Sequence, residues 1–200
     1  MNKKARRAIL SSAMLVLVVS TGCGRSRDQA VAQGFVAQFD RIIEQRKTLD
    51  KLEEQGKQYG EQLEKDLKEP NVTKQVKALG VWVGEYRAML SQARSIVEAQ
   101  SPIVDKLVSE SVRFSGDAAK YAREATDSLR DSVSSQQRGI EIGEQMIALF
   151  ESYIGDPKNT NLRQLEELTK TLEDLDAKEK QAFQRAQDAA LRLRAAAIGS

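Results

Sequence analysis

The chain has 200 residues, with no histidine, one cysteine and three prolines, and 31 basic residues stand against 29 acidic ones. Without histidine the chain lacks the commonest general base and the commonest metal ligand, so we expect no metal site and no cofactor. Charged residues make up 30% of the chain, and Gln, Ala and Leu are abundant. This composition is typical of long helices and coiled coils.

The first 22 residues account for the positive charge of the chain. They contain four basic residues and no acidic one, so the remainder has 27 basic and 29 acidic residues and a net charge of −2. Recognition of nucleic acid requires a concentrated basic face. We therefore expect no nucleic-acid partner.

The same 22 residues have the layout of a secretory signal peptide. Basic residues at positions 3, 4, 6 and 7 precede a mostly apolar run over residues 8–19, and Ser20, Thr21 and Gly22 follow. The run of 12 residues is too short for a transmembrane helix, which needs roughly 20 residues. Removal of residues 1–22 would place Cys23 at the new N-terminus.

Cys23 indicates which kind of signal peptide this is. The segment VSTGC at 19–23 resembles the lipobox of bacterial lipoproteins, with Ser20 at the position usually held by an aliphatic residue. The thiol of such a cysteine receives diacylglycerol before cleavage. Because each buried methylene adds roughly 0.8 kcal/mol to membrane affinity, two or three acyl chains anchor a protein stably. We predict lipidation of Cys23 and a lipid bilayer as its partner; an ordinary signal peptide is the alternative.

After a flexible tether over residues 23–30, we expect one helical domain over residues 31–200. Helix-breaking residues occur at 69–71 (EPN), 115–117 (SGD) and 155–159 (GDPKN), which predicts four helices, at about 31–68, 72–115, 117–154 and 160–197. Asn71 is the expected N-cap of the second helix, and Asp117 that of the third, after a left-handed Gly116. Pro102 either kinks the second helix or splits it.

Apolar residues recur at helical spacing in all four segments. The second segment is the most regular, with steps of four and three through Val72, Val76, Leu79, Val83, Tyr86, Leu90, Ala93 and Val97. Arg46 and Gly56 occupy skipped positions of the first seam. The similar lengths and short connections favour antiparallel neighbours. We predict an all-α fold, a coiled-coil-like bundle of four long antiparallel helices, in which the Ser- and Gln-rich stretch 127–143 is the least stable part.

Two groups of residues are candidate sites. Gly80, Trp82, Gly84 and Tyr86 form an interaction patch in one interpretation, because exposed aromatic side chains anchor interfaces and stack on sugars. In the other, Trp82 covers the edge of the bundle while the glycines admit a bulky neighbour. The acidic residues of the fourth helix are interpreted as its solvated face, with a catalytic carboxylate pair as the alternative (Glu166, Glu167, Glu173, Asp174 and Asp176).

The order of these features resembles a known family. A lipobox, a long helix containing RKTLDKLEE at 46–54, MIALF at 146–150 and LRQLE at 162–166 together resemble the cell-wall-binding lipoproteins of Gram-positive bacteria. The resemblance implies a helical protein on the outer face of the cytoplasmic membrane, facing peptidoglycan.

We therefore expect a non-enzymatic, lipid-anchored envelope module that contacts cell-wall polymer or another envelope protein. Two alternatives remain open: a cell-wall hydrolase that uses carboxylates between helices, and a spacer lipoprotein of the Gram-negative outer membrane or periplasm. The sequence leaves the oligomeric state, the ligand and the host undetermined.

Overall fold

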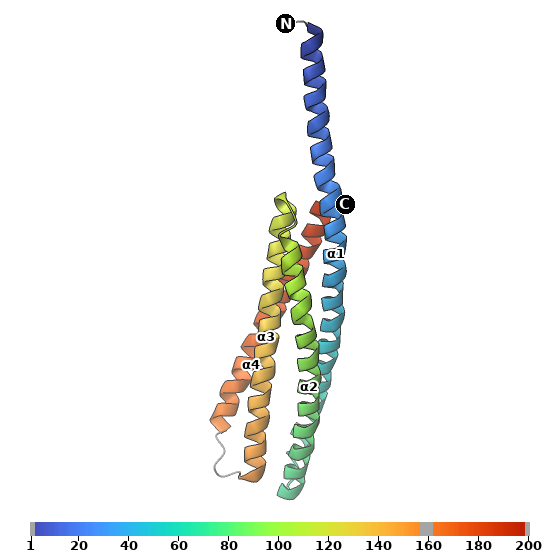
Figure 1. Ribbon diagram of the computed structural model, residues 1–200. Helices are drawn as coiled ribbons and strands as arrows, with labels where there is room; N and C mark the ends of the chain where they lie inside the picture. Colours follow the sequence, from blue (N-terminus) through green and yellow to red (C-terminus); the bar gives the residue numbers. More distant parts are fainter. Residues whose placement is uncertain (1–2, 157–161, 199–200) are drawn as a thin grey trace.

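A computed structural model describes the backbone of residues 3–156 and 162–198 and the side chains of residues 29–156 and 163–197. The described chain consists of four helices, α1 (Lys3–Asp66), α2 (Val72–Ser111), α3 (Gly116–Gly155) and α4 (Leu162–Ile198). Successive helices run in opposite directions and pack side by side, and α1 projects beyond the bundle at its N-terminal end (Figure 1). The predicted all-α four-helix bundle is confirmed.

The helix α1 runs through residues 23–30, where we expect a flexible tether in the mature protein. The side chains of residues 1–28 lie outside the described part of the chain. The signal peptide, its cleavage before Cys23 and the tether therefore stay predictions.

The turns between helices follow the breaker residues, with one shift. Asn71 caps α2 as predicted, and its side chain accepts a hydrogen bond from the backbone N–H of Lys74 at 3.2 Å. Gly116 has a φ of 53°, the left-handed conformation that glycine adopts at little cost. However, α2 ends at Ser111, four residues before the predicted end, and the N-cap position of α3 is Ser115 and not Asp117.

The early end of α2 has a physical reason. The side chain of Phe114 is buried in the turn and meets Phe35 of α1 edge-to-face, with ring centroids 5.7 Å apart. A helix continued through residue 114 would follow the bundle axis, whereas the turn folds Phe114 back over the end of the core. Pro102, by contrast, lies inside α2 without splitting it. Pro102 is exposed, so the carbonyl that loses its helical donor faces water.

The bundle has two unlike halves, which are named here by their residues. The closed half comprises residues 29–49, 93–140 and 181–197, and it contains the whole of the main hydrophobic cluster. This cluster combines large side chains of α1, among them Phe35, Phe39 and Ile42, with alanines of α3 and α4. Small residues on one helix allow its backbone to approach the neighbouring helix closely.

The open half comprises residues 50–92, 141–156 and 163–180. In this half α4 diverges from α1, and Figure 1 shows the lower ends of these two helices well apart. No apolar side chain of residues 163–180 is fully buried; the stripe of Leu165, Leu168, Leu172 and Leu175 is only half-buried. Leucines here replace the alanines that α4 carries in the closed half, so the helices cannot approach as closely.

The Ser- and Gln-rich stretch 127–143 lies mostly in the closed half. Ser128, Leu129, Ser132 and Val133 are all buried there. Small hydroxyl side chains fit between α3 and the alanines of α4, and Ser132 donates a hydrogen bond within the core. The loosely packed part of the bundle is therefore the N-terminal half of α4, and not the stretch that composition indicated.

Candidate binding cleft

The predicted interaction patch divides into two pairs of residues. Trp82 stacks on Tyr86 with ring centroids 4.8 Å apart and meets Phe150 of α3 edge-to-face at 4.9 Å. Trp82 is thus engaged between α2 and α3, whereas Tyr86 stacks on it along α2. Gly80 and Gly84 are exposed, and a Cβ atom added at either would meet nothing within 4 Å. The interpretation that these glycines admit a bulky neighbour is wrong.

The glycine that does admit a neighbour is Gly143. A Cβ atom at this buried position would lie 2.9 Å from both terminal methyl carbons of Leu90. Leu90 therefore packs directly against the backbone of α3. On the protein surface, the ion pairs Arg87–Glu151 and Arg94–Glu144 link the same two helices.

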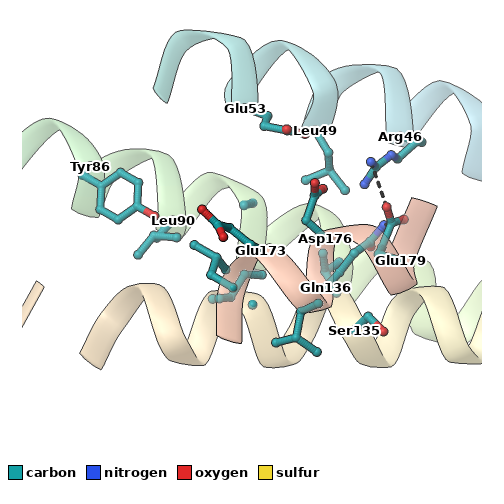
Figure 2. A pocket seen from close by; sticks show the side chains of 16 residues that line it. Arg46, Leu49, Glu53, Tyr86, Leu90, Ser135, Gln136, Glu173, Asp176 and Glu179 are labelled. Atoms are coloured by element: carbon teal, nitrogen blue, oxygen red, sulfur yellow. Dashed lines mark hydrogen bonds and ion pairs between the residues drawn. The ribbon is translucent and has the colours of Figure 1, made fainter. Parts of the chain in front are cut away.

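A cleft of about 370 Å³ opens where α4 leaves α1, and all four helices line it. Its floor is apolar and is formed mainly by four leucines, with Ala93, Val97 and Ile140, whereas carboxylates gather at its mouth. Figure 2 shows the lining, with Leu49 and Glu53 on α1, Tyr86 and Leu90 on α2, and Glu173 and Asp176 on α4. Ligand sites typically combine such an apolar surface with a few fixed polar groups.

The inner end of the cleft is a polar layer that joins the two halves of the bundle. Glu179 is only 3% exposed, and its Oε2 lies 2.9 Å from Nη2 of Arg46. The other carboxylate oxygen accepts hydrogen bonds from Ser132 Oγ at 2.7 Å and Gln136 Nε2 at 2.8 Å. A charge buried to this extent requires such partners, because its desolvation costs several kcal/mol.

Some polar atoms near this layer have no hydrogen-bond partner among the described residues. The Oε1 atom of Gln136 is buried at the cleft without a donor. Gln100 of α2, which is 1% exposed, has neither an acceptor for its Nε2 nor a donor for its Oε1. Burying an amide without a partner costs about 1–3 kcal/mol. The layer therefore offers an unused acceptor, Gln136 Oε1, at the inner end of the cleft.

The amino-acid pattern of two helices carries a signal for this polar layer. Arg46 interrupts the seam of α1. Glu179 interrupts the seam of α4 in the same way, four residues after Leu175 and three before Ala182. Two opposite charges at seam positions indicate a buried pair. The two interruptions taken together would have pointed to this layer, whereas Arg46 alone did not.

The mouth of the cleft carries negative charge. Lys180 contacts Asp176 at 2.7 Å and Glu53 at 3.5 Å, which links α4 to α1. The hydrogen bond to Asp176 raises the pKa of Lys180, and the charge of Glu53 adds to this effect. Glu173 is exposed at the rim. Burial raises the pKa of the Tyr86 hydroxyl at the cleft wall.

Of the carboxylates proposed as a catalytic pair, only Glu173 and Asp176 line the cleft. Glu166, Glu167 and Asp174 are exposed on α4, consistent with a solvated face. Glu179, the most buried carboxylate of the site, was not among the candidate residues predicted from the sequence.

Charge differs between the two halves. The open half has 11 basic and 18 acidic residues, a net charge of −7, whereas the closed half has 13 basic and 10 acidic residues, a net charge of +3. The cleft thus lies in the half of the bundle that has a net negative charge.

Among the described residues, no helix combines the length and hydropathy needed to cross a membrane. Within the same residues, no three Cys, Asp or Glu side chains are grouped as a metal ion would require. Comparisons with models of protein families, with curated proteins and with solved structures find no match to this chain.

Proposed function

We propose that the protein is a non-enzymatic lipoprotein of the bacterial envelope, anchored to the outer face of the cytoplasmic membrane through acylated Cys23, and that its helical rod binds another envelope protein. The anchor rests on the signal-peptide layout and the lipobox-like segment at 19–23. The resemblance to cell-wall-binding lipoproteins supports the same location.

The apolar cleft between α1 and α4 is the observation that carries the choice of a protein partner over wall polymer. Its floor is made of aliphatic side chains, which fit apolar side chains better than the hydroxyl-rich surface of a glycan. Glycans are commonly bound by open aromatic faces, whereas Trp82 is stacked on Tyr86 and meets Phe150 edge-to-face.

The geometry gives less support to a wall hydrolase. Glycoside hydrolysis uses a pair of carboxyl groups that act on the substrate. Three of the four acidic residues at the cleft contact a cation, with Glu179 next to Arg46 and both Glu53 and Asp176 next to Lys180. Among the described residues Glu173 is therefore the one cleft carboxylate without an ionic partner, and a pair is lacking.

Metabolic labelling tests the anchor. Bacteria that express the full chain are grown with radiolabelled palmitate, and we expect label on the wild-type protein and none on Cys23→Ser. The wild-type protein should fractionate with membranes. An unlabelled wild-type protein would refute the proposed anchor.

A second experiment tests the partner. A photo-crosslinking amino acid at position 172, on the cleft floor, should give a crosslinked product with an envelope protein in intact cells. The same amino acid at exposed position 166 is the control. Sedimentation of the purified chain with peptidoglycan, without any protein crosslink, would favour wall polymer, and glycan cleavage by that chain would favour the hydrolase.

A further inference from the structure

The floor of the cleft is part of an incomplete helix-packing seam on α4. Leu165, Leu168, Leu172 and Leu175 are spaced by three and four residues, as in a heptad stripe. Leu172 and Leu175 line the cleft, and Leu165 and Leu168 extend the stripe beyond it. In the closed half this stripe continues as alanines and Leu193, which are buried in the main hydrophobic cluster. In the open half the same stripe is only half covered, because α1 has moved away.

This half-covered stripe is long enough to pack against a second helix. From residue 165 to residue 176 the helix rises roughly 17 Å, at 1.5 Å per residue. Three turns of a second helix would cover that length. The remaining wall residues, among them Leu49, Leu90 and Ile140, come from the other three helices and close the floor.

The charges around the floor define the partner further. Glu53, Glu173 and Asp176 surround the mouth; Lys180 contacts Glu53 and Asp176, and Lys57 contacts Glu53. The open half as a whole has a net charge of −7. At the inner end, Gln136 Oε1 is an acceptor without a donor. Each of these features favours an occupant that brings cations and hydrogen-bond donors.

We infer that the cleft binds one basic amphipathic helix of a partner protein, with its apolar face on the leucine stripe and its Lys and Arg side chains at the acidic mouth. This inference rests on the proposed function and deepens it, because it names the class of partner and the surface that takes it. Helices that lie in a groove use apolar residues at helical spacing in this way.

The test uses a chain that begins at residue 24. Every buried residue of the described structure lies between Val31 and Ala197, so this chain retains the whole described core. The probes are three synthetic 18-residue peptides. The first has leucines at heptad positions and lysines beside them, the second has glutamates in place of the lysines, and the third has the composition of the first with the leucines spread around the helix.

Binding is measured by fluorescence anisotropy of the labelled peptides at low salt and at physiological salt. We expect the lysine peptide to bind at least about tenfold more tightly than either control peptide, with an affinity that falls as salt rises. Glu173→Lys should weaken binding of the lysine peptide about tenfold, since it reverses a charge at the mouth. Glu166→Lys is the matched control on the exposed face of α4 and should change the affinity less than twofold.

Each contrary result overturns the inference in a recognisable way. Equal binding of the three peptides, or equal effects of Glu173→Lys and Glu166→Lys, would show that the cleft does not select the ligand. Self-association of the chain that Glu173→Lys abolishes would assign the cleft to a second copy. Absence of peptide binding, with a crosslink to an envelope protein from position 172 retained, would overturn the basic-helix inference and leave the proposed function in place.

Discussion

The closed and open halves of the bundle are built from the same four helices but differ in how α4 meets α1. In the closed half α4 presents Ala182, Ala186, Ala189 and Ala190, all buried, so the two helices lie close together. In the open half α4 presents leucines, and the helices diverge around a cleft of about 370 Å³. The size of the seam residues on α4 thus decides whether each half has a continuous core or a cleft.

The polar layer at Arg46 and Glu179 lies at the boundary between the two halves and links them. A buried ion pair often contributes little net stability, because desolvation offsets the attraction between the charges. Its geometry nevertheless fixes the register of α4 against α1 and α3, since Glu179 contacts Arg46, Ser132 and Gln136 at once. We interpret the layer as the point at which tight packing stops and the cleft begins.

The largest expected contrast comes from one substitution made in each half. Leu129→Ala in the closed half removes a side chain with no exposed surface, and we expect the free energy of unfolding to fall by about 3–4 kcal/mol. Leu175→Ala in the open half removes a half-buried side chain, and we expect a loss of about 1 kcal/mol. Urea denaturation of the chain from residue 24 measures both values. Equal losses would contradict the division into two halves.

Substitutions in the polar layer should have the next largest effect on the free energy of unfolding. Glu179→Ala leaves the Arg46 guanidinium largely buried, with Asp50 at 3.0 Å as its remaining ionic partner, and we expect a loss of about 2–3 kcal/mol. The double variant Arg46→Met with Glu179→Leu removes both charges and should recover most of that loss. Unfolding free energies of the two variants provide the comparison. If the double variant is no more stable than Glu179→Ala, the cost does not arise from an unpaired buried charge.

Two glycine substitutions should differ by about 1 kcal/mol in their effect on the free energy of unfolding. Gly84→Ala has open space around the new Cβ atom and should stabilise α2 by about 0.5–1 kcal/mol through helix propensity. Gly143→Ala makes the same gain in propensity, but its Cβ atom would lie 2.9 Å from the Leu90 methyl carbons. Leu90 must shift toward the cleft, which we expect to offset the gain. Thermal unfolding of both variants measures the difference, and an equal gain would argue against the close contact of α2 and α3.

The smallest effect concerns alkaline pH. Burial raises the pKa of Tyr86 above its ordinary value of 10.0, so as pH rises past 10 the unfolded chain loses this proton more readily than the folded chain. Folding stability is therefore unaffected by Tyr86 below that pH and falls above it. Tyr86→Phe should reduce the alkaline loss of stability, measured by urea denaturation between pH 9 and 11. An unchanged pH profile in Tyr86→Phe would contradict the burial of this hydroxyl at the cleft wall.

The sequence was sufficient to predict the fold, because helical periodicity and breaker residues are local signals. Asn71, Gly116 and the seam from Leu79 to Val97 all behave as predicted. The predicted end of α2 lies four residues too late. The missing information was the contact between Phe114 and Phe35, two residues far apart in the chain.

The candidate site was predictable only in part, for the same reason. The seam of α4 shows where leucines give way to alanines, but divergence from α1 depends on how two distant helices pack. Trp82 and Tyr86 stand out in the sequence, yet Trp82 packs on Phe150 of α3 and Tyr86 stacks on Trp82. Whether an aromatic residue covers a helix or faces a partner depends on such contacts, which local patterns do not contain.

Hydrogen exchange along α4 tests the difference between the halves most directly, because one helix spans both. Amides of residues 163–178 should exchange at least about tenfold faster than amides of residues 182–197, since local opening costs less where few apolar contacts are lost. The lysine peptide should slow exchange in residues 163–178 and leave residues 182–197 unchanged. Uniform protection along α4, or a peptide that protects only the closed half, would contradict the division into two halves and the cleft between them.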